Sequence, residues 1–232
     1  MEKKNKIDTF GAFALISFSL LLGINHVVIK IVNVGLNPIF FAGIRSFIAF
    51  LFIIIWMKFT RKQIVFNQKN LIICLIAGLV FALEFLFLFL ALDFTSVSRN
   101  SIIYYSMPLW LTVLLFFTKN KEKLSFIKLL GLILAFSGVV ISVSKNDSGL
   151  IINSESLFGD FLAFLAALFW ALLIIIAKNS NFNKEMPEMQ LLWMVMVSGP
   201  ILICFSFFIE DPIRDFQIIH IWGLLFQSIV VV

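Results

Sequence analysis

The stretch that decides the fold is residues 81–110, FALEFLFLFLALDFTSVSRNSIIYYSMPLW. Its first part is an almost unbroken run of Phe and Leu, its centre is a short polar turn, and its last part is apolar again. The stretch therefore predicts the end of one membrane helix, a turn and the start of the next. Glu84 lies inside the apolar run, where an ionised carboxylate needs a partner, a proton or a water-filled cavity.

The composition extends this interpretation to the whole chain. Of the 232 residues, 61% are hydrophobic and 13% charged, and the mean hydropathy is +1.06. A soluble domain has ~45–50% apolar and ~25% charged residues. A β-barrel would show alternating segments of about ten residues, and these runs do not alternate. The predicted fold class is an all-α polytopic membrane protein.

Eight apolar blocks separated by polar segments can be drawn along the chain. They are residues 10–31, 38–57, 71–92, 98–118, 125–143, 157–177, 189–209 and 221–232. A membrane helix needs about 20 residues, so the last block is only about half long enough. The sequence thus predicts about seven full helices and a partial eighth.

The charges predict an orientation in the membrane. The net charge of +5 is scattered over several loops, which favours membrane orientation over a nucleic-acid surface. With a cytoplasmic N-terminus, and with Arg45 set aside as intramembrane, the inner segments hold thirteen Lys and Arg residues and the outer segments four. The outer loops carry acidic residues instead. This excess of basic residues on one side predicts that the N-terminus is cytoplasmic.

An internal repeat is indicated when the chain is compared with itself. A shift of 148 positions aligns Gly11 with Gly159, Phe13 with Phe161, Leu20 with Leu168, Lys30 with Lys178, and Asn33 with Asn181. Because a unit of five helices has an odd number of spans, a second copy must enter the membrane from the opposite side. The prediction is an inverted repeat, with a first unit at residues 10–143 and an incomplete second unit at residues 157–232, enclosing a site near the midplane.

Residues in a fixed order along both units are similar to the sequence pattern of a known family. In the first unit these are Lys30, Pro38, Arg45, Ala91, Leu92, Thr95, Ser96, Pro108, Glu122, Lys123, Gly131 and Gly138. In the second unit, GDFLAFLAALFWALLIIIAK at residues 159–178 contributes Gly159, Ala163, Trp170, Ala171 and Lys178. Over nearly its whole length the chain resembles the drug/metabolite transporter (DMT) superfamily, specifically its EamA branch. The resemblance implies two EamA repeats of about five helices each.

The sequence departs from the family pattern in two places. Leu22 stands where the first repeat often has Trp. The chain also stops where helices nine and ten are expected, although the resemblance implies a central cavity lined by helices one, three and four and by helices six, eight and nine. The expectation is therefore a C-terminally truncated product, a chain completed by another chain, or an incomplete sequence.

Two charged residues are the first candidates for a substrate cavity. At ~1.5 Å per residue, Arg45 and Glu84 lie at about the same depth in the outer half of the membrane. They could form a charged pair along the substrate path, or Glu84 could take up a proton during transport. The alternative is a structural ion pair, because an isolated charge at a helix centre costs ~2.5–3.5 kcal/mol.

Polar and aromatic residues are expected near the same depth. Asn25 and His26 could bond a substrate or a neighbouring helix. Tyr104 and Tyr105 are ~100° apart on a helix, so at most one is expected to face a cavity, where it could stack on a substrate. Packing is the alternative for both tyrosines and the favoured role for Trp170.

Four further residues are expected to shape helices. Pro108 and Pro200 lack the N–H that bonds one turn back and should kink the fourth and seventh spans. Gly131 and Gly138 place small residues on one face of the fifth span, which predicts close helix packing.

The expected function is secondary transport, as efflux or uptake, of a small metabolite such as an amino acid or a related compound, by alternating access. No GxxxxGK[ST] motif is present, so the chain is not expected to hydrolyse ATP. The alternatives are a non-transporting fragment or assembly partner and, with less support, an intramembrane enzyme. The sequence has no HExxH motif, and no catalytic residue is assigned.

No cofactor and no metal site are expected. The expected partners are the lipid bilayer and a small-molecule substrate, with a homodimer as a further option and no nucleic acid. The expected location is the plasma (inner) membrane of a bacterium.

Overall fold

The computed structural model describes residues 9–64, 70–116, 154–209 and 211–231, together with residues 130, 131, 133, 134, 136–138 and 141. Five helices in this part of the chain are long and apolar enough to cross a membrane. They are α1 (Thr9–Gly35), α2 (Pro38–Phe59), α3 (Leu71–Phe94), α7 (Ser154–Asn179) and α8 (Pro187–Ser206). The described residues contain no β-strand. The predicted all-α polytopic membrane fold is confirmed.

Shorter elements lie between and after these long helices. They are α4 (Val97–Tyr104), α5 (Met107–Phe116), the 3₁₀-helix η2 (Asn181–Lys184), α9 (Ile218–Phe226) and the π-helix η3 (Gln227–Val231). The predicted blocks agree with the five long helices to within four residues at each end. The predicted single helix at residues 98–118 is instead divided into α4 and α5, and the block at residues 125–143 lies mostly outside the described residues.

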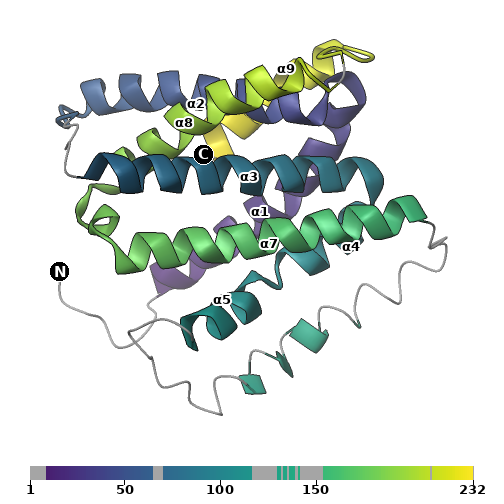
Figure 1. Cartoon of the computed structure of the whole chain (residues 1–232), viewed down its shortest axis with the longest axis horizontal. Helices are drawn as coiled ribbons and strands as arrows, with labels where there is room; N and C mark the ends of the chain where they lie inside the picture. Colours follow the sequence, from purple (N-terminus) through teal and green to yellow (C-terminus); the bar gives the residue numbers. More distant parts are fainter. Residues whose placement is uncertain are drawn as a thin grey trace.

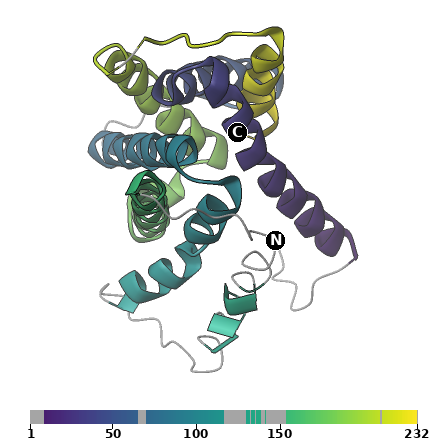
Figure 2. The ribbon, with the colours of Figure 1, turned by 90° about the vertical axis from the view of Figure 1, so that its right-hand side faces the viewer.

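Helix α3 lies in the middle of the bundle. It packs against α7 on one side and against α8 and α2 on the other, while α4 and α5 lie along α7 (Figure 1). The first turns of α1 extend away from the other helices (Figure 2), and apolar side chains there, such as Phe13 and Leu20, are exposed. Glu84, near the centre of α3, is therefore surrounded by helices.

The reversal between α1 and α2 is explained by local sequence. The Asn37 side chain accepts hydrogen bonds from the backbone N–H groups of Ile39 (2.9 Å) and Phe40 (3.3 Å). Pro38 occupies the first helical position, where its missing N–H costs nothing. An Asn cap followed by Pro lets α2 begin with only two residues between it and the end of α1.

Small residues allow α2 and α8 to approach closely. A Cβ added to Gly43 would lie 2.7 Å from the backbone nitrogen of Ile203, and one added to Gly199 would lie 3.3 Å from that of Phe47. Within a membrane, where helices gain little from leaving lipid, such contacts supply the packing energy.

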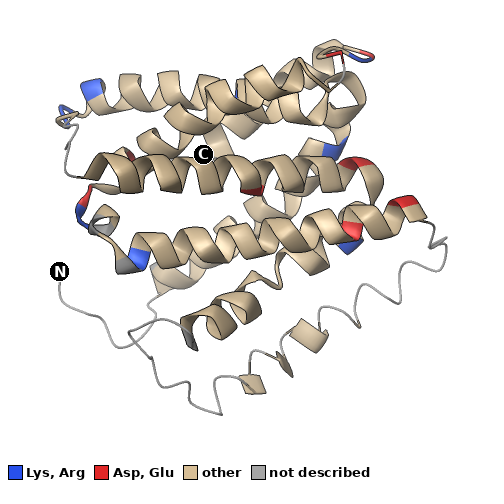
Figure 3. Ribbon diagram, viewed as in Figure 1, with Lys and Arg blue, Asp and Glu red and all other residues tan. Residues whose placement is uncertain are grey.

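The charged residues of the described chain lie mainly near the ends of the helices, and long uncharged stretches separate them (Figure 3). Arg45 and Glu84 are exceptions, because each lies away from the ends of its helix, α2 and α3 respectively, and is buried.

Candidate functional site

A cavity of about 180 Å³ lies between the helices of the bundle. It is lined from α1, α2, α3, α4, the turn after α4, α7, α8 and η3. The lining residues are Leu22, Asn25, Arg45, Phe81, Glu84, Phe85, Leu88, Tyr104, Tyr105, Trp170, Leu173, Leu191 and Val231. Six of the seven residues expected near a substrate cavity are thus brought together, and α2 takes part although the resemblance implied only helices one, three and four of the first repeat.

Glu84 presents a carboxylate to this cavity. The side chain is 3% exposed, and the hydroxyl of Tyr104 donates a hydrogen bond of 2.7 Å to its Oε1 atom. Its Oε2 atom is buried and has no hydrogen-bond partner. A buried carboxylate oxygen without a donor is costly, so one half of this group is available to a ligand or a proton.

Arg45 presents a guanidinium to the same cavity. Its Nε atom donates to the backbone oxygen of Gln227 (3.3 Å), and its Cζ atom lies 4.1 Å from the centre of the Phe85 ring. Its Nη1 atom is buried without a partner. The ring and the carbonyl hold the guanidinium by cation–π attraction and a charge-assisted hydrogen bond.

Arg45 and Glu84 line one cavity, but no direct salt bridge joins them among the described contacts. The reason is that Tyr104 occupies one oxygen of Glu84, whereas Phe85 and Gln227 hold Arg45. The structure therefore leaves a positive and a negative group facing one space, each with an unsatisfied atom.

An aromatic group forms another wall. Tyr104 stacks on Trp170, with ring centroids 4.8 Å apart and an interplanar angle of 17°. Tyr105 stacks on His26 at 5.1 Å, and its hydroxyl donates to the backbone oxygen of Leu22 (3.0 Å). The prediction that at most one tyrosine faces the cavity is wrong. Because α4 ends at Tyr104, Tyr105 belongs to a turn and does not follow the helical 100° rotation.

His26 lies behind this wall and not among the lining residues. Its ring is fully buried, and its Nδ1 atom is 2.8 Å from the hydroxyl of Ser101, while its Nε2 atom has no partner. In this structure His26 does not line the cavity itself but stacks on Tyr105, which does.

Gln227 is a site residue that sequence reasoning missed. It is fully buried in η3, and its side-chain amide donates to the Oδ1 atom (2.5 Å) and the backbone oxygen (3.2 Å) of Asn25. It thereby joins Asn25 on α1 to Arg45 on α2. The available signal was a Gln and a Ser inside an apolar block, since polar residues in membrane segments mark functional positions. Gln227 points inward from a π-helical turn, η3. Such turns often occur at functional sites.

The residues expected to shape helices differ in outcome. The fourth span is interrupted at Tyr105 and Ser106, just before Pro108, which is the second residue of α5. Pro200 lies inside α8, which is one continuous helix from Pro187 to Ser206. A Cβ on Gly131 or Gly138 would meet no atom within 4 Å, so their expected packing is not seen against the described residues.

Comparisons with known proteins agree with this architecture. Residues 9–144 match the sequence model of the EamA-like transporter family. The chain is 28% identical over 219 residues to the "Uncharacterized transporter YoaV" of Bacillus subtilis, covering 93% of this chain and 73% of that protein. It is 22% identical over 190 residues to an "Uncharacterized transporter" of Methanothermobacter thermautotrophicus, covering 76% of this chain and 55% of that protein.

One solved crystal structure has the same fold. It superposes with a TM-score of 0.67 at 14% sequence identity and covers 91% of this chain and 75% of the other. At this identity the likeness concerns the fold alone.

Proposed function

The chain belongs to the EamA-like transporter family, and from that premise we propose that it carries a small zwitterionic metabolite, such as an amino acid or a related compound, through the central cavity by alternating access. The family and the relatives named as transporters point to a membrane transporter and not to an enzyme. The substrate is the finer proposal, and it rests on the chemistry of the cavity.

The observation that carries the proposal is the pair of unsatisfied charged atoms. The Nη1 atom of Arg45 can donate to a substrate carboxylate, and the Oε2 atom of Glu84 can accept from a substrate ammonium group. Charged residues within membrane segments mark substrate pathways when they face a cavity. A zwitterion satisfies both atoms at once and adds no net charge to the site.

The shape and the remaining walls limit the substrate further. A cavity of about 180 Å³ is smaller than the ~300–1,000 Å³ of drug-sized sites. The side formed by α7, α8 and η3 is apolar or aromatic, with Trp170, Leu173, Leu191 and Val231. We therefore expect a small amphipathic molecule with its charged groups towards Arg45 and Glu84 and its apolar part towards Trp170.

The inverted repeat is part of the proposal. Two pairs of lining residues, Leu22 with Trp170 and Asn25 with Leu173, are each separated by 148 positions (170 − 22 and 173 − 25). The spacing equals the shift that aligns residues 10–143 with residues 157–232. Equivalent positions on one cavity support an arrangement in which the two units face each other across the substrate.

The test is transport by the purified protein in liposomes. Uptake of labelled amino acids is measured in competition with unlabelled amino acids and with their derivatives. The N-acetyl derivatives lack the ammonium charge, and the methyl esters lack the carboxylate charge. Because a charge-assisted hydrogen bond is worth ~1.5–3 kcal/mol, each derivative should compete ~10–100-fold less well than the parent. In Glu84→Gln, N-acetylation should hardly weaken competition any further. In Arg45→Gln, esterification should hardly weaken competition any further.

The matched controls are Glu155→Gln and Arg61→Gln, which remove the same charges at exposed positions. Both should transport as the parent protein does. Normal transport by Glu84→Gln and Glu84→Ala at equal expression would eliminate a substrate or proton role for Glu84.

A further inference from the structure

One end of the bundle is crossed by a short connection, residues 211–217, which we call the strap and which precedes α9. The backbone N–H of Asn37 donates to the backbone oxygen of Pro212 (3.0 Å), and the N–H of Arg214 donates to that of Gly35 (3.1 Å). An isolated antiparallel bridge pairs Leu36 with Ile213 between them. The strap is thus bound by main-chain hydrogen bonds across the junction of α1 and α2.

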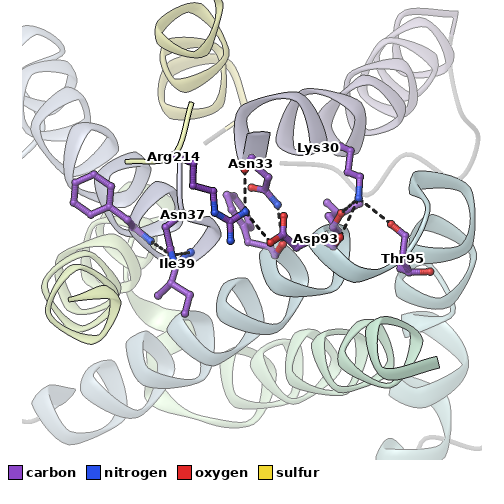
Figure 4. A network of polar contacts seen from close by, with 10 residues as sticks. Lys30, Asn33, Asn37, Ile39, Asp93, Thr95 and Arg214 are labelled. Carbon is purple, nitrogen blue, oxygen red and sulfur yellow. Dashed lines mark hydrogen bonds and ion pairs between the residues drawn. The ribbon is translucent and has the colours of Figure 1, made fainter. Parts of the chain in front are cut away.

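Side chains extend this contact to α3 (Figure 4). The guanidinium of Arg214 donates to the backbone oxygen of Asn33 (3.1 Å) and to the Oδ2 atom of Asp93 (2.8 Å). Asn33 donates in turn to the backbone oxygen of Phe89 (3.0 Å). The Nζ atom of Lys30 donates to the carbonyl oxygens at the C-terminal end of α3, those of Leu92, Asp93 and Thr95. The strap therefore ties α1, α2 and α3 together at this end.

The opposite end has a contact of the same kind between equivalent connections. The Nδ2 atom of Asn70, just before α3, donates to the Oε1 atom of Glu185 at the junction of α7 and α8 (2.6 Å). Lys62, between α2 and α3, forms a salt bridge with Glu188 in the first turn of α8. Asn37 and Glu185 are separated by 148 positions (185 − 37), the same spacing as the repeat. At each end, the connection between the second and third helices of one repeat contacts the junction between the first and second helices of the other.

The two ends differ in how they are held. The strap has main-chain hydrogen bonds and an ion pair, whereas the described contacts across the opposite end are made by side chains. The cavity lies between them. Along α3, Glu84 is about 14 Å from Asp93 and about 21 Å from Asn70 at ~1.5 Å per residue. Among the described residues, main-chain hydrogen bonds between the connections are thus found at the strap end.

We propose that the strap is the gate at its end of the cavity, and that the ion pair between Asp93 and Arg214 is the contact that breaks when the cavity opens there. The pairs Lys62–Glu188 and Asn70–Glu185 are its counterpart at the opposite end. The inference rests on the proposed transport function. The side chain of Arg214 is 31% exposed and that of Asp93 is 23% exposed, so water can replace the bond as it breaks, which suits a contact that must open and close.

The test measures access to the cavity and needs no substrate. Leu22→Cys, on the cavity wall, is labelled by a membrane-impermeant methanethiosulfonate in a background with Cys74→Ala and Cys204→Ala. Vesicles of both orientations give labelling rates from the two faces. Asp93→Asn and Arg214→Gln should each raise the ratio of the strap-face rate to the opposite-face rate at least ~3-fold, by shifting the population of open states.

Two further variants keep the test decisive. Lys62→Gln, the matched control at the opposite end, should lower the same ratio, and the charge exchange Asp93→Arg with Arg214→Asp should return it towards the parent value. An unchanged ratio in both strap variants, or a rise in Lys62→Gln, would overturn the gate. If Asp93→Asn does not elute as a single species in gel filtration, Arg214→Lys, which keeps the charge, serves as the second strap variant and should raise the ratio less than Arg214→Gln.

This outcome is separable from that of the proposed function. A protein that carries none of the tested metabolites but changes its labelling ratio as expected retains the gate and loses the assigned substrate. A protein that transports normally with an invariant ratio loses the gate alone.

Discussion

At the scale of single residues, the buried hydrogen bond between Tyr104 and Glu84 links the cavity carboxylate to the aromatic wall. Tyr104 is 6% exposed and Glu84 3%, so the bond is sheltered from water. A hydrogen bond to a charged group contributes ~1.5–3 kcal/mol, about twice a neutral bond.

Tyr104→Phe removes this bond and keeps the ring that stacks on Trp170. We expect a loss of ~1.5–3 kcal/mol in the free energy of unfolding, measured by denaturant titration in detergent micelles. Tyr105→Phe is the matched control. It loses a bond to the carbonyl oxygen of Leu22 and should cost only ~0.5–1.5 kcal/mol. A larger loss for Tyr105→Phe than for Tyr104→Phe would contradict the ranking.

Gln227 and Asn25 form a second buried pair. Gln227→Leu leaves the Oδ1 atom of Asn25 without this donor, so it should destabilise the protein by ~1–3 kcal/mol. The double variant Asn25→Leu with Gln227→Leu should cost less than the sum of the two single variants, because no orphaned polar group then remains. Strict additivity in this double-mutant cycle, read from the same titration, would show that the contact is not energetically coupled.

At the scale of elements, the interface between α2 and α8 depends on glycine. The backbone of Ile203 lies so close to Gly43 that a methyl group there would collide with main-chain atoms, which cannot turn aside as a side chain can. The interruption between α4 and α5 is a second feature at this scale on which the site depends, because it brings both Tyr104 and Tyr105 to the cavity.

Gly43→Ala should therefore lower the unfolding free energy by ~1–3 kcal/mol through overpacking, seen as a lower thermal midpoint in detergent. Gly23→Ala on α1 is the control, since its Cβ would meet nothing within 4 Å. There the better helix propensity of Ala should stabilise the protein by up to ~1 kcal/mol. An equal effect of the two substitutions would argue against close packing at Gly43.

At the scale of the whole molecule, the proposed inverted repeat predicts that the strap and the Lys62–Glu188 contact lie on opposite faces of the membrane. The excess of basic residues favours the Lys62 face as cytoplasmic.

Single cysteines test this orientation in the background lacking Cys74 and Cys204. Thr60→Cys, beside Lys62, should be protected from an impermeant maleimide added to intact cells and labelled after lysis. Asp215→Cys in the strap should be labelled in both conditions. Both native residues are exposed, so accessibility reports the side of the membrane. The reverse pattern would invert the topology and leave the helix packing unchanged.

Much of the fold follows from the sequence because membrane helices form by a local rule. Each long apolar run must satisfy its own backbone hydrogen bonds in lipid, so hydropathy alone located five spans to within four residues. Helical rise also predicted that Arg45, Glu84, Asn25 and the tyrosines lie at similar depths, and the structure places all of them on one cavity. The position of the break before Pro108 was harder to predict from the sequence. A Pro weakens a helix but does not determine which of the preceding residues departs from helical geometry.

The sequence by itself therefore determined five spans and the fold class, and it predicted most of the polar residues that meet at the cavity. Only the tertiary structure decided that Arg45 is held by Phe85 and the carbonyl of Gln227 while Glu84 is held by Tyr104, so that the two charges face one cavity unpaired. It also decided that the strap reaches α3 through Arg214 and Asp93. These contacts join residues 20 to 182 positions apart. Such pairings depend on how helices rotate and approach one another, which local hydrophobicity does not encode.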